Sequence, residues 1–383
     1  MCPSIKYDFQ KNFQRIDMKG KIDTFITKLE TKQKESNFIF ESSYFPQYFK
    51  TSIASIKLIP ATWRECYDIT LQSTQDYNPC DAIGLLVPNP DHLVDKLISF
   101  CNLEEISNSC FKIERQGLQP FVYEGTLRDF VKYRIDITSI PRKRALFELS
   151  KSCLKKDELE FLCSKEGNSS YLNLIKNRNS LLEILQEFGC KPSLDELILF
   201  CEILKPRYYS MIQANNEPIR ILLGIIADKI ESETVHGHVS GFIKNAFESG
   251  NSKVSIEVCR RNSQIFQNMT SENLICFCTG TGIAPYIAIS KNNKFKNLKL
   301  VYGYRNKEDN LQQYFNVMNN YVLAESSNGK RIGDFVNLIS EFGNDCNVFV
   351  CGNSGMQRET FNLIKTHYPN LITDKKVFFD SWI

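Results

Sequence analysis

The residues best suited to chemistry form a glycine-containing turn that follows an apolar run. Residues 274–279 read Leu-Ile-Cys-Phe-Cys-Thr, and Gly280, Thr281 and Gly282 come next, before Ile-Ala-Pro. Glycines let a phosphate approach the backbone, and the N-terminus of a following helix supplies oriented N–H groups. The pattern predicts a strand, a phosphate-binding turn and a helix. Taken alone, this motif is also compatible with an ordinary glycine turn between a strand and a helix that binds nothing.

Four further motifs occur in a fixed order around this turn. They are Pro-Arg-Tyr-Tyr-Ser at 206–210, Tyr-Gly-Tyr-Arg at 302–305 with Asp309 beyond it, Val-Cys-Gly-Asn at 350–353 with Met356, and Asp-Ser-Trp-Ile at 380–383. In the first of them, Arg207 is a fixed cation suited to a pyrophosphate and Tyr209 offers a flat ring for stacking. The hydroxyl of Ser210 is a hydrogen-bonding group beside that ring.

Together the five motifs resemble the C-terminal half of the diflavin reductases. This family includes NADPH–cytochrome reductase, methionine synthase reductase, the sulfite reductase flavoprotein and the diflavin oxidoreductase of cytosolic iron–sulphur assembly. The resemblance covers residues 48–383. Residues 77–81, Tyr-Asn-Pro-Cys-Asp, are similar to the family's Y-x-P-G-D turn, with Cys80 in place of glycine. Gly352-Asn353 and Ser381-Trp382 are most similar to the iron–sulphur-assembly branch.

The resemblance implies two cofactors, FAD and NADPH, with NADH as the alternative coenzyme. The residues it assigns to FAD are Arg178, Arg207, Tyr208, Tyr209, Ser210, Gly237, His238, Val239, Ser240 and Trp382. The residues it assigns to the coenzyme are Arg260, Gly280, Thr281, Gly282, Arg305, Ser326, Lys330, Arg331 and Glu359. At the 2′-phosphate site Ser327 replaces the family's arginine, so discrimination against NADH is expected to be narrow and to depend on Lys330 and Arg331.

The resemblance also implies a reaction centre made of Ser210, Cys351, Asp380 and Trp382. Trp382 is expected to stack on the flavin and to move away when the nicotinamide arrives. Cys351 as a purely structural buried thiol is the alternative. His236 and His238 have no cysteine or carboxylate partners at metal-ligand spacing, so no metal site is expected.

The elements that would position these residues follow from the apolar patterns. Strand-like runs occupy 48–86, 219–226 and 253–260, and a largely helical stretch lies between them at 91–204. Strands at 274–278, 298–302 and 348–351 alternate with helices, as in a doubly wound parallel sheet. The predicted fold is α/β plus β and ferredoxin-reductase-like. It has an antiparallel FAD-binding β-barrel with a helical insertion (about 90–204) and then a doubly wound parallel-sheet NADP-binding domain.

The predicted domains are an N-terminal helical arm (1–47), the barrel with its insertion (48–268) and the dinucleotide domain (269–383). Residues 8–35 place apolar side chains roughly on one helical face, as a packing arm or a docking surface. Residues 1–47 contain one glycine, at position 20. An FMN site needs a loop rich in serine, threonine and glycine, so this chain is expected not to bind FMN.

Composition restricts the classes of partner and compartment. The chain has 383 residues, a net charge of +3, 24% charged residues and 14 cysteines, none in a C-x-x-C pair. This charge balance gives no case for nucleic acid or an anionic membrane surface. The longest apolar run, 221–227, is too short to span a bilayer. We therefore expect a cytoplasmic protein in which most cysteines act as small core residues.

The function predicted from these motifs is that of an NADPH-dependent flavoprotein oxidoreductase. Electrons would pass from NADPH through FAD to a separate FMN- or iron–sulphur-containing protein, with cytosolic iron–sulphur assembly as one setting. Two alternatives stay open. One is a nucleotide-binding scaffold without activity, which the loss of arginine at Ser327 favours. The other is a fragment of a methionine synthase, sulfite or cytochrome reductase.

Overall fold

The computed structural model divides into two compact units. It describes residues 9–10, 13–14, 23–30, 38–60, 64–74, 76–117, 119–213, 217–230, 233–251, 253–315, 320–343 and 345–381. Unit 1 contains residues 1–47, 86–205 and 229–238, and unit 2 contains residues 48–85, 206–228 and 239–383. The three predicted domains have boundaries that differ from those of the two units, and this division stays a prediction.

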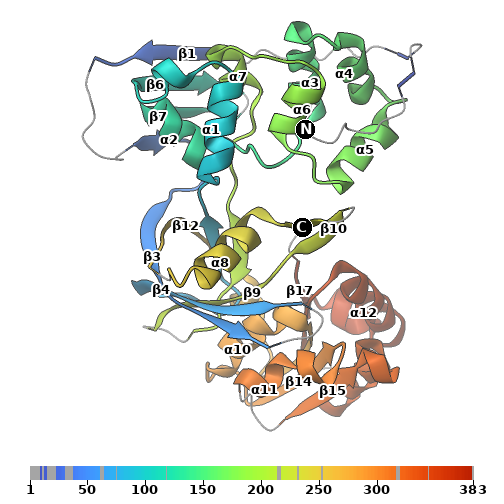
Figure 1. Ribbon diagram of the computed structural model, residues 1–383. Coiled ribbons are helices and arrows are strands. Elements are labelled where there is room, and N and C mark those ends of the chain that lie inside the picture. The colour runs from blue at the N-terminus through green and yellow to red at the C-terminus, as the bar shows by residue number, and fades with distance from the viewer. Residues whose placement is uncertain are drawn as a thin grey trace. The chain divides into compact units, whose positions relative to one another are not determined.

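Unit 1 contains a four-stranded antiparallel sheet in the order β1-β6-β7-β2 (Figure 1). Its strands are β1 (Asp23–Lys28), β2 (Ile39–Glu41), β6 (Cys110–Gln116) and β7 (Phe121–Thr126). The helical prediction for 8–35 is therefore wrong over β1. Aromatic and β-branched residues fill this segment, and they favour a strand once β6 supplies a partner. The rest of that prediction lies mostly outside the described residues.

The insertion predicted to be helical also contains β6 and β7, so it is not helical throughout. Its helices are α1 (Asp91–Phe100), α2 (Leu127–Tyr133), α3 (Lys143–Leu149), α4 (Lys156–Cys163), α5 (Asn168–Lys176), α6 (Leu181–Glu187) and α7 (Leu194–Phe200), with short 3₁₀ helices η1 (Glu104–Ile106) and η2 (Ser150–Ser152). Helices α6 and α7 begin with capping boxes at Ser180 and Ser193, which satisfy their first backbone N–H groups.

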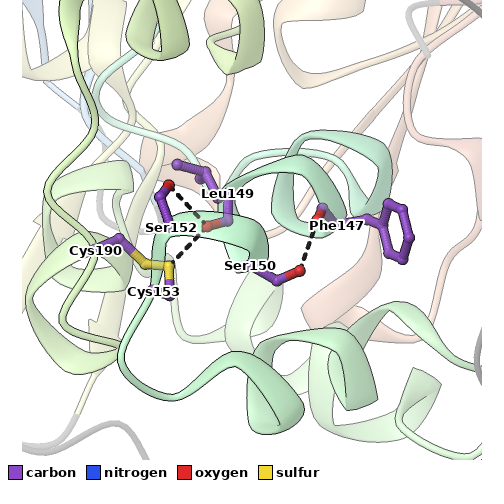
Figure 2. The surroundings of a disulfide bond; sticks show 6 residues. All are labelled: Phe147, Leu149, Ser150, Ser152, Cys153 and Cys190. Carbon is purple, nitrogen blue, oxygen red and sulfur yellow. Dashed lines mark hydrogen bonds between the residues drawn. A yellow bond between two sulfur atoms is a disulfide. The ribbon is translucent and has the colours of Figure 1, made fainter.

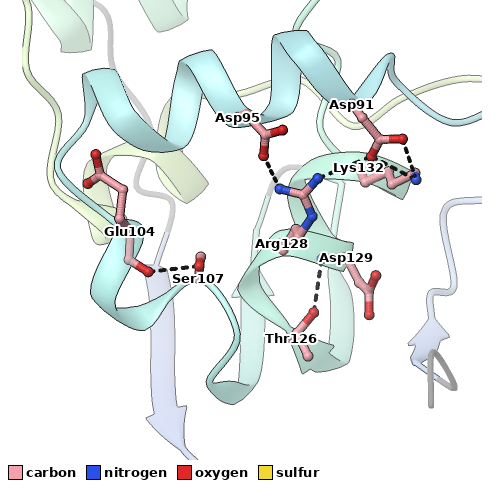
Figure 3. A network of polar contacts seen from close by, with 8 residues as sticks. All are labelled: Asp91, Asp95, Glu104, Ser107, Thr126, Arg128, Asp129 and Lys132. Atoms are coloured by element: carbon pink, nitrogen blue, oxygen red, sulfur yellow. Dashed lines mark hydrogen bonds and ion pairs between the residues drawn. The ribbon is translucent and has the colours of Figure 1, made fainter.

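A surface ion network joins α1 to α2 (Figure 3). Arg128 donates to both Asp91 and Asp95, and Lys132 donates to Asp91 at 2.9 Å. Thr126 caps α2 by accepting the backbone N–H of Asp129 at 3.0 Å. Asp91 and Asp95 are exposed, so water competes for both carboxylates and the network adds little stability.

A disulfide joins Cys153, just after η2, to Cys190, after α6 (Figure 2). The two Cα atoms are 4.2 Å apart and the residues form an isolated antiparallel bridge. Nearby, the hydroxyl of Ser150 donates to the carbonyl of Phe147 at 2.7 Å, closing the end of α3. The sequence does not predict this pair, because it contains no C-x-x-C motif and indicates a cytoplasmic setting, where disulfides are rare. The other cysteines in the described part of the chain are buried and free, as core residues would be.

Unit 2 begins with a six-stranded antiparallel sheet in the order β8-β5-β12-β3-β4-β9. Its strands are β3 (Phe49–Ile59), β4 (Cys66–Thr74), β5 (Ala82–Leu86), β8 (Arg207–Ser210), β9 (Pro218–Gly224) and β12 (Ser255–Arg261). A bridge between Met211 and Ile221 joins the two edge strands, so the sheet closes into a barrel. The two-stranded sheet of β10 (Ala227–Ile230) and β11 (Glu233–His236) belongs mostly to unit 1, which includes residues 229–238. In unit 2, α8 (His238–Glu248), apart from its first residue, and α9 (Ile265–Asn268) complete this part of the chain.

The second part of unit 2 is a five-stranded parallel sheet in the order β15-β14-β13-β16-β17 (Figure 1). Its strands are β13 (Asn273–Thr279), β14 (Asn297–Tyr304), β15 (Tyr321–Glu325), β16 (Asn347–Cys351) and β17 (Val377–Asp380). Its helices are α10 (Ala284–Ser290), α11 (Leu311–Phe315), α12 (Ser354–His367) and α13 (Pro369–Thr373), and its 3₁₀ helices are η3 (Gly280–Ile283), η4 (Lys307–Asp309), η5 (Ser326–Asn328) and η6 (Ile332–Phe342).

The two faces of the parallel sheet are covered by different helices. Leu274, Cys276 and Cys278 pack against α10, together with barrel residues such as Leu222. Ile275 and Phe277, which point to the other face, pack against η6 and α12. A strand that is apolar on both faces is what a doubly wound sheet requires. The predicted fold class, a ferredoxin-reductase-like barrel followed by a parallel sheet, is confirmed. No described helix has the length and apolar character needed to cross a bilayer.

Candidate active site

A cavity of about 940 Å³ in unit 2 collects most of the predicted site residues. It lies where four parallel strands end, because its lining includes the carboxyl ends of β13, β14 and β16 and the residues around the end of β15. Ligands bind at this edge in doubly wound sheets. The predicted residues that line it are Tyr208, Tyr209, Ser210, Gly280, Thr281, Gly282, Arg305, Ser326, Lys330, Arg331, Cys351 and Glu359.

The glycine turn after β13 fits a phosphate-bearing ligand. Gly280 has a φ of +53°, and a Cβ built on it would meet nothing within 4 Å, so the backbone there is open to a ligand. At Gly282 a Cβ would lie 2.6 Å from the carbonyl oxygen of Cys351. Gly282 therefore allows the turn after β13 to approach the end of β16 closely, and any side chain at this position would push the two apart.

Ser210, Cys351 and Asp380 come together from three strands, β8, β16 and β17. The hydroxyl of Ser210 donates to Oδ2 of Asp380 at 3.2 Å, and the thiol of Cys351 lies 3.9 Å from the same oxygen. All three residues are buried, and Ser210 and Cys351 also line the cavity. Burial, and secondly the Asp380 carboxylate, raise the pKa of Cys351 well above its ordinary value. Cys351 is therefore a neutral thiol, able to donate a weak hydrogen bond.

The backbone of Asp380 is held by Gln357 of α12. The Nε2 of Gln357 donates to the carbonyl of Asp380 at 3.2 Å and to that of Gly352 at 2.8 Å. The hydroxyl of Ser381 donates to Oε1 of Gln357 at 2.6 Å. One buried amide thus fixes the ends of β16 and β17 relative to each other. The motifs gave no sign of this role for Gln357.

Two tyrosines of β8 form the barrel side of the cavity. Tyr208 and Tyr209 both line it, and burial raises the pKa of each above its ordinary value, so both remain neutral phenols. The guanidinium of Arg261, at the end of β12, lies 5.5 Å from the ring centre of Tyr208. That contact brings a cation beside an aromatic wall of the cavity. The motifs predict a coenzyme role for the preceding arginine, Arg260, and none for Arg261.

Cations surround the far end of the cavity. Arg305, Lys330 and Arg331 are exposed and line it, together with Ser326, whose hydroxyl donates to the carbonyl of Tyr304 at 3.2 Å. Arg64, just before β4, lines the same cavity and was also missed. It belongs to no motif, and it reaches the cavity because Cys66, two residues on, pairs with Gly224 of β9, which also lines the cavity.

Two predicted arginines of unit 2 are placed differently. Arg207 is exposed at the start of β8. Arg260 donates to Asp81 at 2.8 Å and lies 4.9 Å from the ring centre of Tyr77. It holds the 77–81 turn, in which Cys80 has a φ of +71°. The assignment of Arg260 to the coenzyme stays a prediction, and the structure gives it a second role as an anchor.

The remaining described residues that are predicted to bind FAD do not line this cavity. Arg178 (φ +54°), Gly237 and His238 belong to unit 1, where His238 Nε2 lies 3.0 Å from the carbonyl of Val87. Val239 and Ser240 form the first turn of α8 in unit 2, and the hydroxyl oxygen of Ser240 accepts the N–H of Ile226 at 3.0 Å. Trp382 lies outside the described residues. The flavin roles of these residues stay predictions.

Comparison with known proteins identifies the region around the barrel. Residues 60–242 match a family model described as an FAD binding domain. This part of the chain is similar to that family. The match ends before the parallel sheet begins. The similarity of that sheet to known proteins rests on the longer alignments with individual relatives.

Three relatives extend the similarity beyond that domain. The NADPH–cytochrome P450 reductase of Drosophila melanogaster is 27% identical over 254 residues, which are 61% of this chain and 37% of that protein. Human methionine synthase reductase is 25% identical over 279 residues, 61% of this chain and 40% of that protein. NADPH-dependent diflavin oxidoreductase 1 of Saccharomyces cerevisiae is 23% identical over 325 residues, 73% of this chain and 52% of that protein.

These matches confirm the resemblance to the FAD- and NADP-binding half of the diflavin reductases. The chain covers well under two thirds of the length of each of these relatives. Among solved structures, the ferredoxin-NADP⁺ reductase of Plasmodium falciparum aligns with a TM-score of 0.46 at 15% identity, covering 88% of this chain and 96% of that one.

Proposed function

We propose that this chain is an NADPH-dependent flavoprotein oxidoreductase that passes electrons from NADPH through bound FAD to a separate acceptor protein. The observation that carries this proposal is the cavity where Tyr208, Tyr209 and Ser210 face the carboxyl ends of the parallel strands. An aromatic wall and a phosphate-binding turn thus share one cavity, as a stacked flavin and a dinucleotide require.

The residues present fit both groups. Tyr209 would stack on the flavin and Arg207 would reach its pyrophosphate. The open backbone at Gly280 and the cations Arg305, Lys330 and Arg331 would hold the coenzyme. When bound, the flavin supplies the redox chemistry, because it accepts an electron pair from the nicotinamide and releases it to the acceptor.

The protein's contribution at the reacting end is hydrogen bonding and exclusion of water. Ser210 and Cys351 point their donors at one oxygen of Asp380, which is itself 7% exposed. This buried carboxylate fixes both donors in place, and with a coenzyme bound it would stabilise positive charge on the nicotinamide. In this proposal these three residues orient and stabilise charge, and none of them attacks the substrate.

The acceptor in this proposal is an FMN- or iron–sulphur-containing protein in the cytoplasm. The support is the similarity to the FAD/NADP half of proteins named as diflavin oxidoreductase and methionine synthase reductase. Cytosolic iron–sulphur assembly is one such setting. Electron transfer to a purified flavodoxin-like or iron–sulphur protein, compared with cytochrome c as a non-specific acceptor, tests this part.

Flavin content and its response to coenzyme test the enzyme itself. The purified chain is expected to carry FAD in stoichiometric amount and to lose its visible flavin absorbance when NADPH is added without oxygen. A protein that binds FAD and NADPH without any loss of absorbance would instead be the nucleotide-binding scaffold. A protein that releases FMN on extraction would contradict the cofactor assignment.

A further inference from the structure

Glu325 is an acidic residue next to the cavity, between two residues that line it, and none of the motifs assigns it a role. It is the last residue of β15 and pairs in register with Tyr304 at the end of β14. Its chain neighbours on both sides, Ala324 and Ser326, line the cavity, as do Tyr304 and Lys330. Glu325 therefore lies at the edge of the sheet where a dinucleotide binds.

The carboxylate of Glu325 is held in position by the turn that follows it. The hydroxyl of Ser327 donates to Oε1 at 3.1 Å, and the side-chain amide of Asn328 donates to Oε2 at 2.9 Å. The backbone carbonyl of Glu325 accepts the N–H of Lys330 at 3.2 Å, with Gly329 closing the turn at a φ of +77°. The position expected to carry a phosphate-binding arginine, Ser327, thus donates to an acid.

The charges at this end of the cavity oppose one another. Lys330 and Arg331 would attract a 2′-phosphate, which carries two negative charges. The carboxylate of Glu325, at the end of β15 and five residues before Lys330, repels the same phosphate. Carboxylates at the end of such a strand instead accept hydrogen bonds from the free 2′-hydroxyl of NADH.

We propose that Glu325 sets coenzyme specificity by disfavouring the 2′-phosphate, so that NADH competes with NADPH at this site. This inference rests on the proposed function, because it assumes that the cavity takes a nicotinamide coenzyme. Ser327 in place of an arginine would only weaken the binding of the 2′-phosphate. Glu325 would in addition repel the phosphate and so reduce the preference for NADPH over NADH.

Two adenosine fragments of the coenzymes test the proposal without the flavin. Titration calorimetry on the full chain measures Kd for 2′,5′-ADP, which carries the 2′-phosphate, and for 5′-AMP, which does not. Glu325→Gln keeps the shape of the side chain and removes its charge. It is expected to lower Kd for 2′,5′-ADP about five- to tenfold, because it removes a Coulomb repulsion between the carboxylate and the doubly charged phosphate that salt screens in part. Kd for 5′-AMP is expected to stay the same or to rise.

Two further variants keep the result interpretable. Glu105→Gln makes the same change in net charge at an exposed position of unit 1 and should leave both Kd values unchanged. Ser327→Arg removes one donor to Glu325 and adds a cation, so it should favour 2′,5′-ADP even if Glu325→Gln folds poorly.

The outcomes separate the two proposals. If Glu325→Gln changes both Kd values equally, or no more than Glu105→Gln does, the role of Glu325 is refuted while the coenzyme site stands. If the wild-type chain binds neither fragment, the cavity is not a coenzyme site and both proposals fail. A selective gain for 2′,5′-ADP in Glu325→Gln and Ser327→Arg supports the role of Glu325.

Discussion

Asp68 and Arg220 form a partly buried ion pair that tests how unit 2 is held together. Asp68 of β4 has a side chain that is 2% exposed, and Arg220 of β9 donates to both of its oxygens, with Nε at 2.7 Å from Oδ1. Tyr314 of α11 donates to Oδ2 at 3.2 Å. Because Leu311 of the same helix lines the cavity, this cluster connects the barrel to the cavity wall.

The perturbation is Arg220→Met, which keeps much of the side chain's bulk and removes its charge. It would leave the Asp68 carboxylate buried with the hydroxyl of Tyr314 as its hydrogen-bond donor from α11. Removing one partner of a fully buried pair costs about 3–5 kcal/mol. The Arg220 side chain is 34% exposed, so water screens part of the interaction, and we expect a loss of about 2–3 kcal/mol. The double variant Asp68→Asn/Arg220→Met removes the stranded charge and should recover most of that loss.

Urea unfolding followed by circular dichroism measures these changes in the free energy of unfolding. Arg128→Met is the matched control, since Arg128 also bridges two carboxylates, Asp91 and Asp95, but both of these face water (Figure 3). It should change stability much less. The reasoning is refuted if Arg220→Met costs no more than Arg128→Met. It is also refuted if the double variant is no more stable than Arg220→Met alone.

Three further predictions concern the cavity and its thiols. Gly282→Ala places a Cβ against the carbonyl of Cys351 and should raise KM for NADPH at least tenfold in steady-state kinetics, whereas an unchanged KM would mean that the turn does not contact the coenzyme. The double variant Lys330→Ala/Arg331→Ala should raise KM for NADPH by about tenfold or more and KM for NADH much less, because charge-assisted hydrogen bonds to phosphate are worth about 1.5–3 kcal/mol each. An equal rise in both KM values would mean that the 2′-phosphate binds elsewhere. Burial raises the pKa of Cys80, Cys278 and Cys351 well above the ordinary value, so at pH 8 these thiols stay protonated and iodoacetamide should label them only after unfolding, as peptide mass spectrometry will show.

The parallel sheet was predictable because its strands carry two signals at once. The runs at 274–278 and 348–351 are apolar on both faces, and glycines follow each of them. Those glycines also predict where the site lies, because the carboxyl ends of neighbouring parallel strands meet at one edge of the sheet. The residues predicted from these turns, such as Thr281 and Cys351, therefore line a common cavity.

The remaining features depend on contacts that a single segment does not encode. Ile22, Phe25, Ile26 and Leu29 have helical spacing, and only pairing with β6 makes residues 23–28 a strand. Arg260 and Arg261 are adjacent in sequence, and the buried carboxylate of Asp81 decides which one holds the turn and which one stacks on Tyr208. Gln357 and Glu325 act through backbone groups and hydroxyls brought close by folding, so no motif reveals them.

The disulfide between Cys153 and Cys190 changes how this protein behaves when its chain is cut (Figure 2). Helices α4, α5 and α6 all lie between the two cysteines. A single cleavage anywhere in that stretch produces two peptides that remain one molecule until a reducing agent is added. Intact and nicked protein would therefore run together on a non-reducing gel and separate on a reducing one. Closing a loop of this length also lowers the entropy of the unfolded chain, which raises the free energy of unfolding by roughly 3–4 kcal/mol at 25 °C. The helices inside the loop therefore resist the opening that proteases need.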